Sequence, residues 1–329
     1  MNPRTVVSIA AFALLSACNG LAPFAPTPSA TPTLLPPSET PTREIPPTIA
    51  ATPTLYVSPT PTWVAQGPGA IKVPILMYHH VEVAPIQSDF RVSASKFEDE
   101  LRLLRDWEYS SITTNILVQA ITKGVSLPPR PVIITFDDAN EDNYTVAFPI
   151  MQKYGFTGVL YLPYDYIGAP NCLTVGQIKE MSAAGWEIGS HSLTHLNETS
   201  MEPGQLRAEI VDSRKDLMNL LGVPILTFAY PFGDVSPEAV DYVHFAGYIA
   251  AMDAKGYTAD QGLGNLFALQ REEIRGSEDA KTFIRFLPWL GDPSYLPSDT
   301  PTLTPTASRT PIPTYTQYPT RTPKVSATP

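Results

Sequence analysis

Two adjacent carboxylates, Asp137 and Asp138, end an apolar, β-branched run over residues 131–136. Such a run is typical of a strand that is buried on both faces. In parallel α/β sheets, ligands bind at the carboxyl ends of the strands. Two neighbouring carboxylates repel each other when both are ionised, and a cation bound by one of them removes that conflict. The pair therefore predicts a reaction centre in which one acid holds a metal and the other acts as a base.

Two histidines, His191 and His195, follow a second short apolar run over residues 186–190. If one helical turn carries them, their spacing puts both imidazoles on one face. With Asp138 they would form a site of two histidines and one carboxylate, which leaves positions open for water and substrate. This ligand set does not select a single metal, and we expect one divalent ion, zinc, with cobalt or nickel as alternatives.

Four motifs, in a fixed order along the chain, carry a resemblance to a known family. They are Ile-Leu-Met-Tyr-His-His-Val at 75–81, Ile-Thr-Phe-Asp-Asp at 134–138, Gly-Ser-His-Ser-Leu-Thr-His at 189–195 and Ala-Tyr-Pro-Phe-Gly at 229–233. In these motifs the chain resembles the polysaccharide deacetylases, also called the NodB-homology family or carbohydrate esterase family 4. It is most similar to the branch with Met-Tyr-His and Tyr-Pro-Phe-Gly motifs, which includes poly-N-acetylglucosamine deacetylases. The resemblance covers roughly residues 70 to 290.

The resemblance implies roles for the residues singled out above. Asp138, His191 and His195 would be the metal ligands, and Asp137 the general base that takes a proton from the attacking water. It also implies a distorted, incomplete (β/α)7 barrel as the fold.

Other positions match the family less closely. The backbone N–H of Phe232 would help to hold the oxyanion, although many members have Tyr there. Ala229 replaces the usual Arg, which leaves open how the base is oriented, and Arg271 resembles a later Arg that contacts the catalytic Asp. No histidine follows His244, so the family's late general acid is missing. We expect His79 to line the site, either as the acid that protonates the leaving amine or only as a structural or substrate contact.

Alternating strands and helices with short turns predict a parallel sheet with right-handed crossovers. The pattern alone does not separate an incomplete barrel from a doubly wound sheet. Polar residues at the expected N-caps are Ser95, Thr174 and Ser236. The expected strands are 72–78, 131–138, 156–162, 186–190, 224–229, 248–252 and 268–274, and the expected helices are 96–107, 115–122, 144–154, 175–185, 203–221, 237–246 and 278–287.

The two ends of the chain have a different composition from the middle. Arg4, the apolar residues 6–15 and the lipobox-like residues 15–18 predict a lipoprotein signal peptide over 1–18, cleaved before an acylated Cys18. We therefore expect an extracytoplasmic protein, lipid-anchored at the bacterial cell surface. Most of the 36 prolines fall in two Pro/Thr-rich segments, a linker at 19–69 and a tail at 291–329, which we expect to be disordered around a catalytic domain at 70–290.

The net charge of −10 and the pI of about 5.0 argue against nucleic acid as a partner and suit a neutral or cationic sugar polymer. We expect a monomeric, metal-dependent polysaccharide deacetylase, a hydrolase of non-peptide carbon–nitrogen bonds. Its N-acetylated substrate would be a glucosamine-containing polymer, an exopolysaccharide or peptidoglycan, from which it releases acetate. Two alternatives remain: a hydrolase of small linear amides on the same scaffold, and a catalytically impaired carbohydrate-binding surface protein.

Overall fold

A computed structural model of the protein describes residues 62–85, 88–197 and 201–292. The expected signal peptide, the lipobox, nearly all of the linker and nearly all of the tail lie outside these ranges. Strand β1 (Val64–Ala65), at the end of the expected linker, pairs antiparallel with β7 (Ser126–Leu127). None of the helices within the described ranges combines the length and the hydropathy that a membrane crossing requires.

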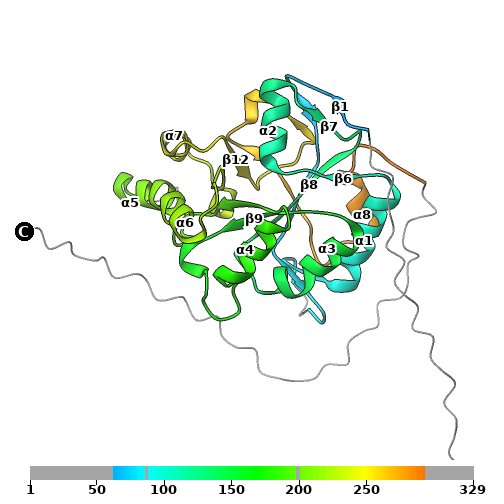
Figure 1. Ribbon diagram of the computed structural model, residues 1–329, viewed down its shortest axis with the longest axis horizontal. Coiled ribbons are helices and arrows are strands. Elements are labelled where there is room, and N and C mark those ends of the chain that lie inside the picture. Colours follow the sequence, from blue (N-terminus) through cyan, green and yellow to red (C-terminus); the bar gives the residue numbers. More distant parts are fainter. Residues whose placement is uncertain (1–61, 86–87, 198–200, 293–329) are drawn as a thin grey trace, which may run out of the picture. The chain divides into compact units, whose positions relative to one another are not determined.

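A nine-stranded sheet made only of parallel pairs curls into a nearly closed barrel (Figure 1). This confirms the predicted distorted, incomplete barrel and excludes the doubly wound sheet. The strands follow the order β14 (Leu269–Gln270), β12 (Ala250–Asp253), β11 (Thr227–Ala229), β10 (Glu187–Ser190), β9 (Val159–Leu162), β8 (Pro131–Asp137), β3 (Ile75–Tyr78) and β15 (Glu272–Glu273), with β6 (Ser110–Ser111) beside β8.

The barrel is bridged at its seam by a single residue. Strands β14 and β15 lie at the two ends of the strand order, yet only Arg271 separates them along the chain. The sequence predicted one strand over 268–274, and the structure instead shows two short strands that pair with opposite edges, β12 and β3. The chain therefore changes pairing partners at Arg271.

The helices lie where they were predicted, with local differences. The expected helix at 144–154 begins with a π turn, and the expected closing helix at 278–287 is a short α-helix followed by a 3-10 turn. Ser93, not Ser95, caps the first helix, because its side chain is the one that accepts from the amide of Lys96. The expected helix at 203–221 contains one π-helical turn. The helices are α1 (Ala94–Asp106), α2 (Thr114–Lys123), η1 (Asn143–Ala147, a π turn), α3 (Phe148–Tyr154), η2 (Tyr164–Tyr166), α4 (Val175–Ala183), α5 (Pro203–Arg207), η4 (Ala208–Asp212, a π turn), α6 (Ser213–Leu221), η5 (Pro231–Gly233), α7 (Pro237–Ala246), η6 (Leu263–Asn265), α8 (Ala280–Phe283) and η7 (Ile284–Phe286).

The first expected strand, 72–78, is interrupted. Strand β2 (Ile71–Lys72) pairs with β13 (Asp260–Gln261), and β3 resumes only at Ile75. Pro74 lies between them and has no N–H to donate to a strand ladder. A further small pair, β4 (His80–Glu82) and β5 (Arg91–Ser93), follows β3.

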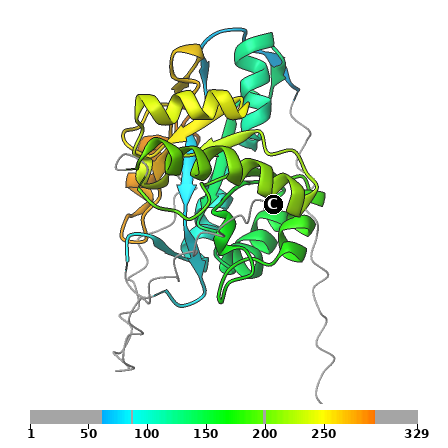
Figure 2. The ribbon, with the colours of Figure 1, turned by 90° about the vertical axis from the view of Figure 1, so that its left-hand side faces the viewer.

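Alternate residues of each barrel strand face opposite sides. Ile134 and Phe136 of β8 belong to a core shared with the outer helices, whereas Ile133 belongs to a second core inside the barrel. That inner core includes Leu117 of α2. Helix α2 closes the amino-terminal end of the barrel and lies at the top of Figure 2. The carboxyl ends of the strands, where both polar motifs lie, therefore form the opposite, accessible end.

Gly189 leaves room for an aromatic ring inside the barrel. A Cβ at this position would meet Tyr161 Cε1 at 2.4 Å and the carbonyl oxygen of Thr227 at 3.0 Å. We expect Gly189→Ala to lower the free energy of unfolding by about 1–3 kcal/mol through overpacking, as urea denaturation would measure. Gly204→Ala is the matched control, because a Cβ there meets nothing within 4 Å. Equal stability of the two variants would contradict this expectation.

Candidate active site

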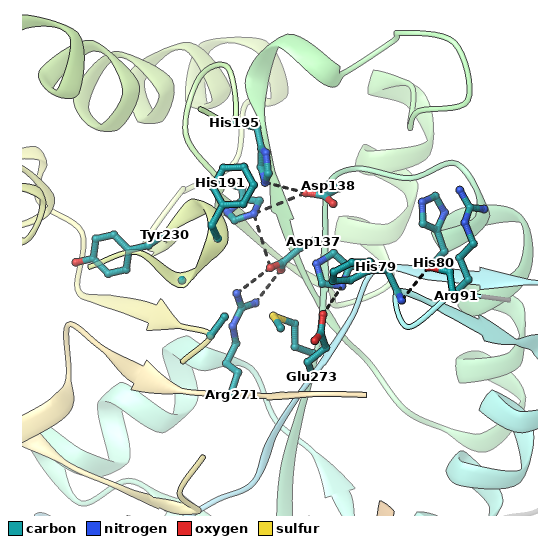
Figure 3. Close-up of a pocket in the computed structure, with 16 residues that line it drawn as sticks. His79, His80, Arg91, Asp137, Asp138, His191, His195, Tyr230, Arg271 and Glu273 are labelled. Atoms are coloured by element: carbon teal, nitrogen blue, oxygen red, sulfur yellow. Dashed lines mark hydrogen bonds and ion pairs between the residues drawn. The ribbon is translucent and has the colours of Figure 1, made fainter. Parts of the chain in front are cut away.

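Asp138, His191 and His195 meet at the carboxyl ends of β8 and β10 (Figure 3). The Oδ1 atom of Asp138 lies 3.2 Å from His195 Nε2 and 3.7 Å from His191 Nε2. One ligand atom from each of the three residues lies within 4.8 Å of the others. The structure therefore brings together the carboxylate and the two imidazoles predicted as metal ligands.

The atoms at this point suit a cation. Asp138 Oδ1 is buried and accepts no hydrogen bond from the described residues, which is costly for a carboxylate oxygen unless a cation is bound. The carbonyl oxygen of Ala229 lies 2.8 Å from His191 Nδ1. If Nδ1 carries the proton, it donates a hydrogen bond to that carbonyl. The lone pair of Nε2 then faces Asp138, as in many histidine ligands of metals.

The prediction that one helical turn carries both histidines is wrong. Residues 191–195 form an irregular loop in which Ser192 and His195 have φ values of 70° and 58°. The Ser192 hydroxyl accepts a hydrogen bond from the His195 amide at 2.9 Å. Two left-handed residues in four positions are incompatible with an α-helix, so a tight loop turns the imidazoles toward each other.

Burial sets the protonation state of His191. It lowers the pKa of this imidazole to about 4, against the opposing charge of Asp137. In the metal-free protein we expect the ring carbon signals of His191 to titrate in NMR spectra near pH 4 and not near 6.5. Because the folded pKa is the lower one, the stability that neutral His191 contributes is complete above 6.5 and falls as the pH drops towards 4. A midpoint near 6.5 would contradict this.

Asp137 forms a bidentate ion pair with Arg271. The guanidinium Nη1 and Nη2 atoms donate to Oδ1 and Oδ2 at 2.8 and 2.7 Å, and the two side chains are 2 % and 1 % exposed. Burial alone would raise the pKa of Asp137, but the charge and hydrogen bonds of Arg271 lower it to about 2. An arginine from the barrel seam thus fixes the orientation of the predicted base, which Ala229 had left open.

His79 lies in the same pocket as the predicted ligands and base. Its Nδ1 atom is 3.9 Å from Glu273 Oε1, and its ring meets the ring of Phe90 edge-on at 5.1 Å. The carbonyl oxygen of His79 accepts from the side-chain amides of Asn140 and Asn143 at 3.2 and 2.8 Å. These bonds fix the turn that aims the imidazole into the pocket.

Phe232 lies across the pocket in the short turn η5. Its backbone has a φ of 60°, its side chain is 57 % exposed, and its ring lies 4.9 Å from that of His195. The residue therefore presents both its backbone and an aromatic face to the pocket. The structure brings all seven predicted site residues to one pocket of about 560 Å³.

Sequence reasoning missed several residues that line this pocket, among them Phe90, Arg91 and Glu273. Glu273 could have been found, because it follows Arg271 by two residues in an extended segment and so shares its side. Phe90 and Arg91 lie in a loop and a short strand with no periodic pattern, and only the folded chain reveals their place.

A second cluster, His80, Glu82 and Asp142, also has the composition of a metal site. Its atoms already have partners: His80 Nδ1 lies 2.6 Å from Asp142 Oδ2, the Val81 amide donates to Asp142 Oδ1, and Glu82 pairs with Arg91. The arginine charge opposes a cation there. This cluster is accounted for by its role in fixing the turn around His79.

Comparisons with known proteins agree with the fold and the motifs. A family model described as polysaccharide deacetylase matches residues 124–251. YxkH of Bacillus subtilis (strain 168), provisionally named a polysaccharide deacetylase, is 30% identical over 212 residues, which is 64% of this chain and 75% of YxkH. The poly-beta-1,6-N-acetyl-D-glucosamine N-deacetylase of Staphylococcus aureus (strain N315) is 26% identical over 186 residues, 52% of this chain and 64% of that enzyme. The structure of the Streptococcus pyogenes deacetylase PplD in complex with acetate has a TM-score of 0.61 at 23% identity and covers 69% of this chain and 99% of PplD.

Proposed function

Because this chain belongs to the polysaccharide deacetylase family, whose members are hydrolases, we propose that it removes N-acetyl groups from a glucosamine-containing polymer and releases acetate. The observation that carries the proposal is the buried Asp138 Oδ1 between two imidazole nitrogens, with the Asp137–Arg271 pair beside it. The relative from Staphylococcus aureus is named for such a substrate. An exopolysaccharide and peptidoglycan are the two polymers that we consider.

We infer that Asp138, His191 and His195 hold one divalent metal ion, and propose zinc, with cobalt and nickel able to replace it. When bound, the ion would polarise the acetamide carbonyl and acidify the attacking water. Asp138 contributes the negative charge, and the hydrogen bond between His191 Nδ1 and the Ala229 carbonyl holds its ring in the ligating orientation.

Asp137 is the proposed general base. Arg271 occupies one side of each carboxylate oxygen, which leaves the opposite lone pairs for a proton from water. The pKa of about 2 keeps Asp137 ionised at neutral pH, so that a lone pair is available for that proton. The fixed guanidinium also prevents rotation of the carboxylate, so no reorganisation is needed during the reaction.

His79 is the proposed general acid that protonates the leaving amine, and Glu273 supports it with a carboxylate 3.9 Å from Nδ1. The Phe232 N–H is the proposed donor to the oxyanion. If His79 acts as an acid, His79→Gln lowers kcat and removes one limb of the pH–rate profile. If His79→Gln has an unchanged rate and pH profile, His79 is not the general acid and serves only as a structural or substrate contact.

Two exposed phenylalanines support a polymer as the substrate. Phe90 and Phe232 are 52 % and 57 % exposed, and each lies against a histidine of the site, His79 and His195. Exposed aromatic faces beside an open pocket are suited to stacking on sugar rings. Small linear amides would gain nothing from them.

We expect Phe90→Ala to raise KM for an N-acetylglucosamine pentamer about three- to tenfold while kcat changes little. The reason is the loss of a stacking surface outside the reacting centre. Phe245→Ala is the control, because Phe245 is also exposed, at 71 %, but lies on α7 and does not line the pocket. A kinetic comparison in which both variants match the wild type would contradict the stacking role.

The most direct test of the proposed function is acetate release from N-acetylglucosamine oligomers, with and without a chelator. We expect release that stops on chelation and returns when zinc is added. Hydrolysis of a small linear amide without release from the oligomers would instead favour the amide hydrolase. Binding of oligomers with no hydrolysis of either substrate would favour an impaired carbohydrate-binding protein.

We also propose that Cys18 is acylated and anchors the chain to the outer face of a bacterial membrane, because residues 15–18 have the pattern of a lipobox. Labelled palmitate would then be incorporated into the wild type and not into Cys18→Ser. If neither protein incorporates palmitate, the N-terminal segment is instead a signal peptide without lipid attachment.

A further inference from the structure

A carboxylate outside the pocket holds the loop that carries both histidines. Glu209 lies in the π turn η4 and is 6 % exposed. Its Oε2 atom accepts hydrogen bonds from the amides of Leu193 and Thr194 at 2.9 and 2.8 Å, and its Oε1 atom accepts from the Thr194 hydroxyl at 2.7 Å. Three donors of the segment between His191 and His195 thus converge on one side chain.

The loop needs such an anchor. It belongs to no helix or strand, and Ser192 and His195 hold left-handed backbone conformations that side chains other than glycine disfavour. Within the loop, the bond from the His195 amide to the Ser192 hydroxyl fixes the turn locally. The middle of the loop is held from two sides: the amides of Tyr164 and Asp165 in η2 donate to the carbonyl oxygens of Ser192 and Leu193 at 3.2 and 2.9 Å, and Glu209 holds the amides of residues 193 and 194.

Hydrogen bonds link the helix that carries Glu209 to two neighbouring segments of the barrel. The carbonyl oxygen of Ile210 accepts from the hydroxyls of Ser213 and Tyr248, each at 3.1 Å. The Ser213 hydroxyl also lies 3.0 Å from that of Ser190, at the end of β10. The helix is therefore linked to the strand that precedes His191 and, through Tyr248, to the segment that precedes β12. π turns of this kind often occur next to functional sites.

We propose that Glu209 is a positioning residue that sets the metal affinity of the site by holding residues 193–194, and with them His191 and His195, in the ligating arrangement. This rests on the proposed function, in which these histidines bind a metal. A preformed pair of imidazoles binds a cation more tightly than a pair that must first be ordered. Glu209 makes no contact with the pocket, so its effect should appear in metal binding before it appears in the reaction itself.

The chain provides both a conservative variant and a matched control. Glu209→Met keeps the volume and removes all three acceptor interactions. Glu209→Gln keeps an oxygen for the two amides and an NH₂ that can donate to the Thr194 hydroxyl. Glu187 is the control, because it also accepts from a backbone amide, that of Asn115, and from a threonine hydroxyl, that of Thr227, both at 2.8 Å. It lies at the first residue of β10, at the opposite end of the strand from His191.

The test is zinc affinity of the full chain, measured by competition with a chromogenic chelator, together with thermal unfolding and kcat at saturating zinc. We expect Glu209→Met to weaken zinc binding about 10- to 100-fold, with kcat at saturating zinc within a few fold of the wild type. Glu209→Gln should recover most of the affinity. Glu187→Met should bind zinc like the wild type, even if its melting temperature falls as much as that of Glu209→Met.

Thr194→Val offers a milder change should Glu209→Met not fold. It deletes one hydrogen bond, and we expect it to weaken zinc binding about threefold to fivefold. The proposal is overturned if the variants at 209 and 194 bind zinc as tightly as the wild type, or if Glu187→Met loses as much affinity as Glu209→Met. A wild type that binds no zinc would overturn the proposed metal site itself, which is a separate result.

Discussion

Replacing Asp137 with asparagine lowers the rate of acetate release by about 10²- to 10⁴-fold, the usual contribution of a general base. The amide cannot accept the proton of the attacking water, while Asp138, His191 and His195 are untouched. We therefore expect the variant still to bind zinc, but more weakly than the wild type, because a negative charge 3.7 Å from His191 Nε2 is lost. Steady-state kinetics on N-acetylglucosamine oligomers, with zinc binding measured in parallel, checks both parts.

This substitution also leaves Arg271 buried without its counter-charge, and a loss of activity could then come from a loss of folding. The double variant Asp137→Asn with Arg271→Gln restores a neutral, hydrogen-bonded pair of similar size. We expect it to regain much of the stability and none of the activity. Recovery of activity together with stability would remove Asp137 from the role of base.

Arg271→Met has the largest expected effect on stability. It leaves the Asp137 carboxylate 2 % exposed and without the guanidinium that donates to both of its oxygens. Removing one partner of a buried ion pair lowers the free energy of unfolding by about 3–5 kcal/mol. Chemical denaturation of the metal-free proteins at pH 7 measures this difference. A loss below about 1 kcal/mol, typical of an exposed pair, would contradict the burial argument.

The same variant should change the pH dependence of stability. In the wild type the pKa of Asp137 is about 2, below its usual 3.8, so its contribution is complete above 3.8 and is lost as the pH falls through 2. Without Arg271, burial raises the pKa of Asp137 above 3.8. The folded variant then binds a proton that the unfolded chain does not. We therefore expect the difference in unfolding free energy between the wild type and Arg271→Met to shrink from pH 7 to pH 4.

The sequence predicted the barrel because its strands and helices carry clear local signals. The apolar run at β8 and the caps at Thr174 and Ser236 agree with the structure. What it missed depends on tertiary contacts. The split of the last strand at Arg271 reflects closure of the barrel, and the π turn in the 203–221 helix accompanies the contacts of Ile210 and Glu209.

The site residues that could be predicted from the sequence are those that lie at or just after the end of a strand. Asp137, Asp138, His191 and His195 follow that rule. The conformation of the histidine loop could not be predicted, because i,i+4 spacing fits a helical turn as well as a tight loop. Glu209 left a weak signal, a charged residue beside Leu206 and Ile210 on the buried face of a helix.

An anomalous difference map from crystals soaked in zinc would locate the cation that we propose between Asp138, His191 and His195. We expect one strong peak within ligand distance of Asp138 Oδ1, His191 Nε2 and His195 Nε2, and no peak after soaking in chelator. A peak at His80, Glu82 and Asp142 instead, or no ordered zinc at either cluster, would contradict a metal site at Asp138.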